Sequence, residues 1–242
     1  MLEINKVYNM DCVDGIKLLD DNSIDLVIID PPYKLDIVKL KNTTKFNNYA
    51  NELLGLKDGF DLKILDLLVA KMKKINIYIY CSKRQVKELL EYFINRKCNY
   101  EILTWHKMNP SPLTNNIYLP DTEYIVFARE KGVRLYGNYH TKRKYYISGV
   151  NQADKKKWKH PTIKPLPFIE NHIINSSNEG DLILDCFAGS GTTLVGAINQ
   201  NRNFIGFEIN KKYYEIAQYR INEALEKKKG EDKWENNRRI II

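Results

Sequence analysis

The chain is 242 residues long, which suits one α/β domain with an insertion and allows a substantial core. Its formal net charge is +8, from 38 lysines and arginines against 30 acids, and its four cysteines show no C-x-x-C spacing, which argues against a disulfide framework. No signal peptide or bilayer-length apolar run is recognisable, so the sequence predicts a cytoplasmic protein without a membrane partner.

Apolar runs with strand-like and helix-like spacing alternate along the first half of the chain. The expected strands are 6–8, 24–29, 75–80, 100–105 and 123–128, and the expected helices are 13–19, 62–74 and 84–95. This alternation predicts an α/β fold with a doubly wound, largely parallel, Rossmann-like sheet. Ligand sites of such sheets lie at the carboxyl ends of the strands.

The tetrapeptide Asp30-Pro31-Pro32-Tyr33 follows the second expected strand directly. Prolines fix φ and donate no N–H, so their carbonyls stay free to accept hydrogen bonds. Asp30 and the Pro31 carbonyl therefore suit the two protons of an exocyclic amine on a planar group, while the Tyr33 ring stacks on its face. The plain structural alternative is a Pro-Pro turn with a packed tyrosine. The polar stretch 34–50 comes next, and we predict a mobile lid there.

A second motif lies near the C-terminus. An expected strand at 181–185 ends in Asp185, and the turn Cys186-Phe187-Ala188-Gly189-Ser190-Gly191-Thr192-Thr193 follows it, before helical spacing at 194–198. A strand, a Gly-rich turn and a helix allow a ligand to approach backbone N–H groups at a helix N-terminus. The alternative is an ordinary strand-to-helix turn.

This turn is neither of the two common phosphate-binding patterns. Leu194 stands where the dinucleotide fingerprint needs its third glycine, and the Gly-Lys-Ser/Thr of a P-loop is missing. The next expected strand, 203–207, ends in Glu208, which suits the hydroxyls of a ribose. We therefore expect a nucleoside-containing cofactor other than NAD. Helices are expected at 165–174 and 211–228, and the charged tail beyond is expected to fray.

Together these motifs resemble those of the S-adenosylmethionine-dependent amino methyltransferases of DNA. In that family the D-P-P-Y motif holds the target amine, and F-x-G-x-G, here Phe187 to Gly191, holds the cofactor. The order of the motifs resembles the circularly permuted beta class. Three more segments are similar to family segments, namely Asn9-Met10-Asp11, His160-Pro161-Thr162-Ile163-Lys164-Pro165, and Tyr213 to Arg220, which resembles the helix that follows the ribose acid. The resemblance covers nearly the whole chain.

The resemblance implies a Rossmann-like methyltransferase sheet, S-adenosylmethionine as cofactor, and a site without metal. The catalytic residues would be Asp30, Pro31, Pro32 and Tyr33. The cofactor-binding residues would be Asp11, Lys164, Asp185, Phe187, Gly189, Ser190, Gly191, Thr192 and Glu208. Asp11 would meet the adenine of the cofactor and Lys164 its carboxylate; the alternative for Lys164 is a place at the start of the helix expected at 165–174.

Positive charge is concentrated in one part of the chain. Residues 131–170 contain ten lysines and arginines against two acids, a surplus equal to the whole net charge, and aromatic residues lie among them. Such mixing is typical of a nucleic-acid surface, although a solvated basic loop is the ordinary reading of a lysine run. The family resemblance implies that the target-recognition region lies here, which favours DNA contact. The expected DNA contacts are Lys34, Lys41, Arg134, Lys142, Arg143, Lys144, Lys155, Lys156 and Lys157. Arg134 and Arg143 are the better candidates for reading bases, because only arginine offers a bidentate fork to guanine.

The expected reaction is methyl transfer to the N6 of a flipped adenine in double-stranded DNA, in a restriction-modification or orphan modification system. In the resembling family an aspartate in the first motif position goes mainly with adenine. Cytosine N4 is the alternative base, and RNA, a protein glutamine or a binding role without catalysis are the other readings. A homodimer and a cognate restriction endonuclease are the expected partners, in a prokaryotic or phage setting.

The chain divides on this interpretation into four parts. Residues 1–130 form the catalytic half of the methyltransferase domain, 131–160 a target-recognition insertion, 161–228 the cofactor-binding half, and 229–242 a charged tail.

Overall fold

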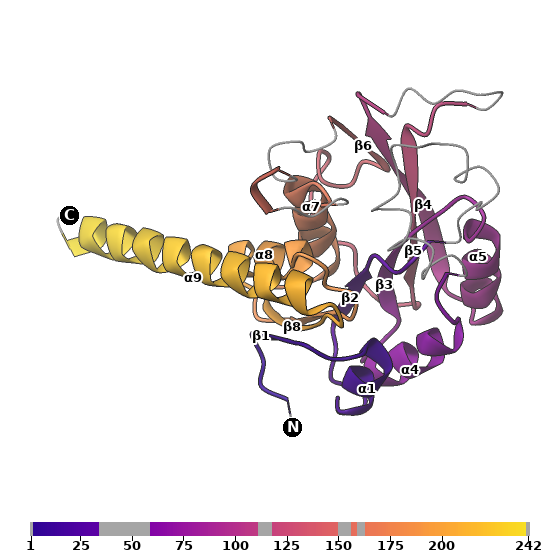
Figure 1. The fold of residues 1–242 in the computed structure, drawn as a ribbon, viewed down its shortest axis with the longest axis horizontal. Helices are drawn as coiled ribbons and strands as arrows, with labels where there is room; N and C mark the ends of the chain where they lie inside the picture. The colour runs from indigo at the N-terminus through magenta and orange to yellow at the C-terminus, as the bar shows by residue number, and fades with distance from the viewer. Residues whose placement is uncertain (1, 34–58, 111–117, 150–155, 159–162, 241–242) are drawn as a thin grey trace.

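The computed structural model describes residues 2–33, 59–110, 118–149, 156–158 and 163–240. Its named strands form one eight-stranded sheet in the order β1-β8-β7-β2-β3-β5-β4-β6 (Figure 1). The strands are β1 (Lys6–Tyr8), β2 (Leu26–Ile29), β3 (Asn76–Cys81), β4 (Asn99–Lys107), β5 (Thr122–Arg129), β6 (Tyr145–Ser148), β7 (Leu182–Asp185) and β8 (Asn203–Phe207). The helices are α1 (Cys12–Lys17), α4 (Lys63–Lys71), α5 (Val86–Asn95), α7 (Leu166–Ser176), α8 (Thr192–Asn199) and α9 (Lys211–Ile240).

The sheet is largely parallel, as predicted. β5 is antiparallel to both of its neighbours, β3 and β4, and the other neighbouring pairs are parallel. Because β3 and β4 are both antiparallel to β5, they run in the same direction. The carboxyl ends of β2, β3, β4 and β7 therefore lie at one edge of the sheet.

Helices cover both faces of the sheet, and the side chains of each strand alternate between two cores. In β2, Val27 and Ile29 face the core beneath α1, α4 and α5, whereas Leu26 and Ile28 face the core beneath α7, α8 and α9. Figure 1 shows α5 and α7 on opposite sides of the strands. β2 is buried along its whole length because it lies in the middle of this three-layer arrangement.

The strand order reverses between β7 and β2. Leu26 pairs with Ile183 and Val27 with Leu184, so these parallel strands end side by side. From β2 the chain continues to β3 on one side, and from β7 it continues to β8 on the other. Open α/β sheets bind ligands in the crevice formed at such a switch point. The fold thus brings the two sequence motifs, which lie in opposite halves of the chain, to one place.

The basic segment contains a strand that the sequence pattern did not predict. Tyr145–Ser148 forms β6, which pairs in parallel with β4 at the edge of the sheet. Its aromatic and β-branched residues favour a strand, but the basic residues around them hide the pattern. The ring of Tyr146 stacks on Phe168 of α7, with 4.9 Å between the centroids.

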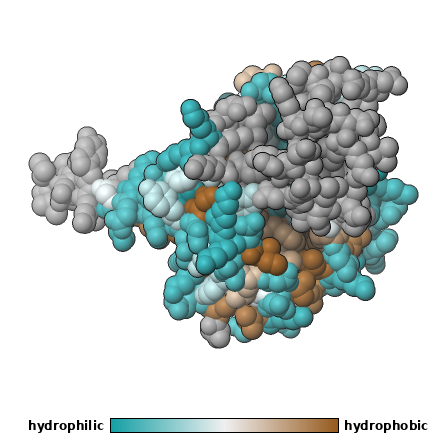
Figure 2. All heavy atoms as spheres, in the orientation of Figure 1, coloured by the Kyte–Doolittle hydropathy of each residue, from teal (hydrophilic) through white to brown (hydrophobic). Residues whose placement is uncertain are grey.

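The C-terminal tail was expected to fray, and that expectation is wrong for the backbone. α9 runs without interruption from Lys211 to Ile240 and projects beyond the sheet in Figure 1. The tail is rich in glutamate and lysine, which are good helix formers, and Lys229 pairs with Glu226 one turn earlier at 3.0 Å. Figure 2 shows hydrophilic residues over most of the visible surface of the described side chains of this helix.

Candidate active site

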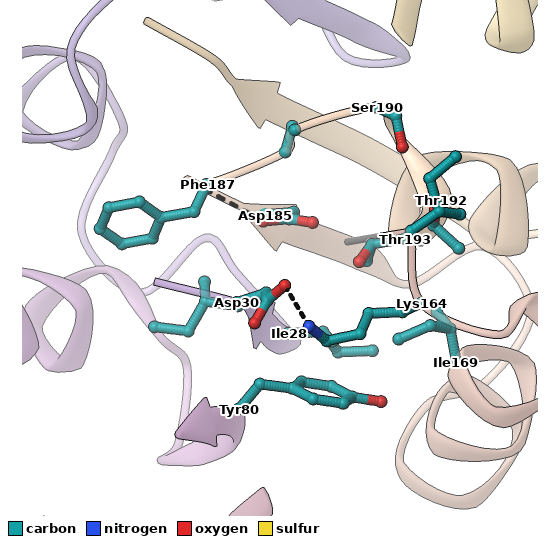
Figure 3. Close-up of a pocket in the computed structure, with 14 residues that line it drawn as sticks. Ile28, Asp30, Tyr80, Lys164, Ile169, Asp185, Phe187, Ser190, Thr192 and Thr193 are labelled. Carbon is teal, nitrogen blue, oxygen red and sulfur yellow. Dashed lines mark hydrogen bonds and ion pairs between the residues drawn. The ribbon is translucent and has the colours of Figure 1, made fainter. Parts of the chain in front are cut away.

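A pocket lies at the carboxyl ends of β2 and β7 (Figure 3). The predicted residues that line it are Asp30, Lys164, Asp185, Phe187, Gly189, Ser190 and Thr192. The first comes from the end of β2, the second from the segment before α7, and the others from β7 and the turn after it. The structure therefore brings the D-P-P-Y aspartate and the Gly-rich turn into one pocket.

Both carboxylate oxygens of Asp30 are engaged. Lys164 Nζ lies 2.6 Å from Asp30 Oδ2, and the Tyr33 hydroxyl donates to Asp30 Oδ1 at 2.8 Å. Figure 3 shows the Lys164 side chain reaching across the pocket to Asp30. Lys164, for which we expected a contact with the cofactor carboxylate, thus forms an ion pair with the aspartate of the D-P-P-Y motif. Its expected cofactor role stays a prediction, because it also lines the same pocket as the Gly-rich turn.

Burial and charge shape the protonation of this group. Burial raises the pKa of the Asp30 carboxyl, and the Lys164 ammonium opposes that rise. Burial lowers the pKa of Lys164, but attraction to Asp30 and Glu123 outweighs it, so the pKa of that ammonium is raised. Lys164 therefore stays charged, and an ionised Asp30 depends on that charge.

Two members of this cluster were missed in the sequence. Glu123, at the start of β5, has Oε2 at 3.2 Å from Lys164 Nζ and accepts a hydrogen bond from Tyr33 at 3.3 Å. Lys107, at the end of β4, has Nζ 2.6 Å from Glu123 Oε1. The only sequence signal is a charged residue at the boundary of an apolar strand, and that pattern is equally typical of a solvent-facing position.

The Gly-rich turn adopts backbone angles that favour glycine. φ is 51° at Gly189 and 79° at Gly191, and a Cβ built on Gly191 would lie 3.0 Å from Ala217 Cβ of α9. A side chain at this position would strain the backbone and push α9 away. Thr192 begins α8 directly after the turn, so the N-terminus of that helix faces the ligand side of the switch point.

Arg220 of α9 donates hydrogen bonds to this turn, and the sequence analysis did not predict that role. Its Nη1 donates to the carbonyl and hydroxyl oxygens of Ser190, at 2.7 and 2.8 Å, and to Thr192 Oγ1 at 3.0 Å. Ser190 and Thr192 were predicted to bind cofactor, and their hydroxyls also serve this arginine. A signal was present, since Arg220 stands on the same helix face as the buried residues Ala217 and Ile221.

The other predicted cofactor acids end the strands beside the turn. Asp185 Oδ1 accepts a hydrogen bond from Phe187 N at 3.0 Å, and burial raises the pKa of Asp185 to about 7. Glu208 follows β8 and accepts from Gly189 N at 2.8 Å, and burial raises its pKa too. Asp11 caps α1, with Oδ1 accepting from Val13 N at 2.8 Å. Each acid thus has a structural bond, which leaves further lone pairs for a ligand.

Comparison with known proteins gives a consistent picture. The model of the N6/N4 DNA methylase family matches residues 24–219. This chain belongs to the S-adenosylmethionine-dependent DNA amino methyltransferases. It is 39% identical over 236 residues to Type II methyltransferase M2.LlaDCHI of Lactococcus lactis subsp. cremoris, covering 87% of this chain and 88% of that protein. It is 30% identical over 264 residues to Type II methyltransferase M1.MboII of Moraxella bovis, covering 92% of this chain and 98% of that protein.

The fold comparison agrees with the sequence comparison. The crystal structure of an M1.HpyAVI–SAM complex superposes with a TM-score of 0.66 at 27% identity, covering 89% of this chain and 98% of that chain. The predicted family and the predicted Rossmann-like methyltransferase fold are therefore confirmed.

In this methyltransferase the predicted DNA contacts within the described residues do not form one surface around the pocket. Arg134, Lys142, Arg143 and Lys144 precede β6, which runs parallel to β4, so they lie toward the end of the sheet opposite Asp30. Tyr136, two residues after Arg134, donates its N–H to the carbonyl of Asn175 in the last turn of α7, far from the start of that helix beside Lys164. This placement does not favour Arg134 and Arg143 as readers of a base held at Asp30.

The lysines after β6 lie nearer to the cofactor turn. Lys157 Nζ is 3.1 Å from Glu223 of α9, and the Trp158 ring lies 5.7 Å from the guanidinium of Arg220. Lys156 is exposed beside them. Lys34, Lys41 and Lys155, together with the lid expected at 34–50, fall outside the described residues. DNA contact by any of these lysines remains a prediction.

The described residues show neither a metal-binding cluster nor a membrane-spanning helix. Among them no group of three or more histidine, cysteine, aspartate or glutamate side chains is arranged to hold a metal ion. No helix within the described ranges is long and apolar enough to cross a membrane.

Proposed function

We propose that this methyltransferase transfers a methyl group to the exocyclic N6 of a flipped adenine in duplex DNA, with Asp30 as the residue that binds the amine. The observation that supports this proposal most directly is the common pocket of Asp30 and the Gly-rich turn. An acceptor for an amine and a site for a nucleoside cofactor must be adjacent if a group is to pass directly between them.

The chemistry of the donor set around the turn fits S-adenosylmethionine. Glu208 offers carboxylate oxygens suited to ribose hydroxyls, and the N-terminus of α8 and Lys164 offer positive charge suited to a carboxylate. Asp11 is the residue that the family resemblance assigns to the adenine of the cofactor, and Phe187 belongs to the segment that would hold the cofactor. When bound, this cofactor supplies a methyl group on a positively charged sulfur, which an amine nitrogen can attack.

The residues of the D-P-P-Y motif would prepare the amine. The nitrogen of an adenine amine is a weak nucleophile because its lone pair is delocalised into the ring. Hydrogen bonds to Asp30 and to the Pro31 carbonyl bias that nitrogen toward tetrahedral geometry and aim its lone pair at the methyl group. As the nitrogen becomes positive, the ionised Asp30 stabilises that charge and takes the surplus proton. Holding both partners in attack geometry contributes several kcal/mol, up to about 7–11.

A base held in a duplex stack does not reach Asp30, so the target must be flipped at a cost of a few kcal/mol. Tyr33 would recover about 1–3 kcal/mol by stacking on it. In the structure the Tyr33 hydroxyl is bonded to Asp30, and its ring is partly buried against the core beneath α7.

The choice of adenine over cytosine depends on the aspartate in the first motif position, as implied by the family resemblance. Cytosine N4 carries a similar amine and would use the same residues. Association with a second copy of the chain and with a cognate restriction endonuclease are further predictions, which the Type II methyltransferases among the relatives make reasonable.

The test is nucleoside mass spectrometry on duplex DNA of mixed sequence incubated with the protein and S-adenosylmethionine. We expect N6-methyladenine with the wild-type protein, none with Asp30→Ala, and an unchanged yield with Asp20→Ala, an exposed aspartate before the same strand. N4-methylcytosine would overturn the choice of base. Failure of Asp30→Ala to bind the cofactor, measured by calorimetry, would overturn the assignment of Asp30 to the amine alone.

A further inference from the structure

The two groups that bind Asp30 share a second partner. Lys164 Nζ lies 2.6 Å from Asp30 Oδ2 and 3.2 Å from Glu123 Oε2. The Tyr33 hydroxyl lies 2.8 Å from Asp30 Oδ1 and 3.3 Å from the same Glu123 Oε2. Each donor thus has a short contact with one acid and a longer contact with a single oxygen of the other.

A target amine needs the carboxylate oxygens of Asp30, which Tyr33 and Lys164 occupy in this structure. Its N–H must bond to Asp30, whose two oxygens already accept from Tyr33 and Lys164. Each oxygen keeps a second lone pair, but an oxygen that already accepts from a hydroxyl or an ammonium is a weaker acceptor, so the bond from the amine strengthens when a donor turns away. Lys164 has only 7% of its side chain exposed, and a buried ammonium that leaves its counter-ion is strongly destabilised unless another anion receives it.

We propose that Glu123 is a positioning residue that receives the Tyr33 hydroxyl and the Lys164 ammonium when the target amine takes Asp30. This inference rests on the proposed role of Asp30 in binding the amine. In the ligand-free site Asp30 holds both donors closely. In the substrate-bound site Glu123 Oε2 holds them, the Tyr33 ring is released toward the base, and Asp30 is free to accept the amine.

The charge on Glu123 suits this role. Burial alone would raise the pKa of Glu123, but attraction to Lys164 and Lys107 lowers it to about 2. Glu123 therefore ionises more readily than Asp30, whose pKa is raised by burial. An acid that is held in its charged form can receive an ammonium.

Lys107 orients the carboxylate of Glu123. Its Nζ binds Glu123 Oε1 at 2.6 Å, from β4, which is the strand next to β5. That contact leaves Oε2 turned toward Lys164 and Tyr33. Glu123 has 16% of its side chain exposed and Lys107 has 20%, so both charges are largely withdrawn from water.

The test compares Glu123→Gln with the wild-type protein in single-turnover methyl transfer to duplex DNA at saturating cofactor. Glutamine keeps the volume of the side chain but brings no negative charge for the displaced ammonium. We expect the rate to fall by about tenfold or more, while the cofactor affinity stays within about threefold and unfolding stays cooperative. The matched control is Glu101→Gln, which removes an acid paired with Lys144 at 2.5 Å at the other end of β4, and it should keep the wild-type rate.

A double-mutant cycle with Tyr33→Phe separates this role from a structural one. If Glu123 serves to receive the Tyr33 hydroxyl, it matters less once that hydroxyl is gone. The rate loss caused by Glu123→Gln should then be at least about threefold smaller in the Tyr33→Phe background than in the wild-type background. Equal losses in both backgrounds would overturn the proposal.

Two other outcomes also decide the question. A Glu123→Gln rate within threefold of the wild type overturns the inference, as does a parallel loss of rate, cofactor affinity and stability. If Glu123→Gln does not fold, Glu123→Asp takes its place, since it keeps the charge but withdraws the oxygen. A wild-type protein that methylates no base would instead contradict the proposed function.

Discussion

Lys164 and Asp30 come from opposite halves of the chain, yet their side chains meet at 2.6 Å in the middle of the active site. The ammonium is the charge that opposes the effect of burial on Asp30. The proposed role of Asp30 requires its ionised form, so the acid limb of the pH–rate profile should report on this contact.

Lys164→Met should therefore shift that acid limb to higher pH. Without the ammonium, burial and the neighbouring Glu123 raise the pKa of Asp30 further, so a larger fraction is protonated at a given pH. We expect a greater loss of single-turnover rate at pH 6 than at pH 8.5, measured at saturating cofactor. A loss of the same factor at every pH would show that Lys164 does not act through the ionisation of Asp30.

Arg220→Met should weaken cofactor binding although the side chain lies behind the turn. The change leaves the carbonyl and hydroxyl of Ser190 and the hydroxyl of Thr192 without their charged donor. We expect about 2–4 kcal/mol less stability and about tenfold weaker binding of S-adenosylmethionine by calorimetry. Arg220→Lys, which keeps the charge but loses the fork, should fall between the two proteins. Wild-type affinity in a stably folded Arg220→Met protein would contradict this account.

Gly191→Ala should cost more than the same change at Gly180. Both glycines have positive φ, 79° and 82°, so both changes carry the backbone penalty of about 1–2 kcal/mol. A Cβ at Gly180 meets nothing within 4 Å, whereas one at Gly191 lies 3.0 Å from Ala217 Cβ and 3.2 Å from its Cα. Overpacking of this kind adds about 1–3 kcal/mol. Urea unfolding of the two variants measures the difference, and Ala217→Gly in the Gly191→Ala protein should recover part of it.

Asp185→Asn should change how stability depends on pH. The folded-state pKa of about 7 lies above the ordinary value of 3.8, so the folded protein keeps a proton that the unfolded chain has released. That contribution is present below about pH 4 and is lost as pH rises to about 7. Relative to the wild type, Asp185→Asn should therefore gain about 2–3 kcal/mol between pH 5 and pH 8. Cofactor-free urea titrations at both values test this, and identical pH dependence in the two proteins would be the contrary result.

Periodicity and the two motifs were sufficient to predict the fold class and its ligand edge. The strands around Val27 and Leu184 have apolar runs that only a doubly covered sheet can bury, and Asp30 and Asp185 stand directly at their ends. Those features are local in the sequence. The placement of the two motifs in one pocket then followed from the rule for parallel sheets.

The missed features depend on contacts between distant segments. Glu123 has the sequence context of an ordinary edge residue, and only the fold places it against Lys164. β6 was missed because its four residues are surrounded by basic ones, and its direction places the basic residues before it toward the end of the sheet opposite Asp30. Helix capping and cofactor binding also suit the same residue, as Asp11 shows, so sequence alone does not separate them.

The contacts of Lys164 with Asp30 and Glu123 have a consequence for synthesis of the chain. Asp30 and Glu123 leave the ribosome long before Lys164, so a nascent chain that ends before residue 163 carries two acids with Lys107 as their single cation from this cluster. Burying that pair would leave a net negative charge in a low-dielectric interior, which is strongly unfavourable. Electrostatic repulsion should therefore delay the burial of Asp30 and Glu123 until Lys164 has been synthesised. A prematurely terminated product would carry the amine notch without the ability to modify a genome.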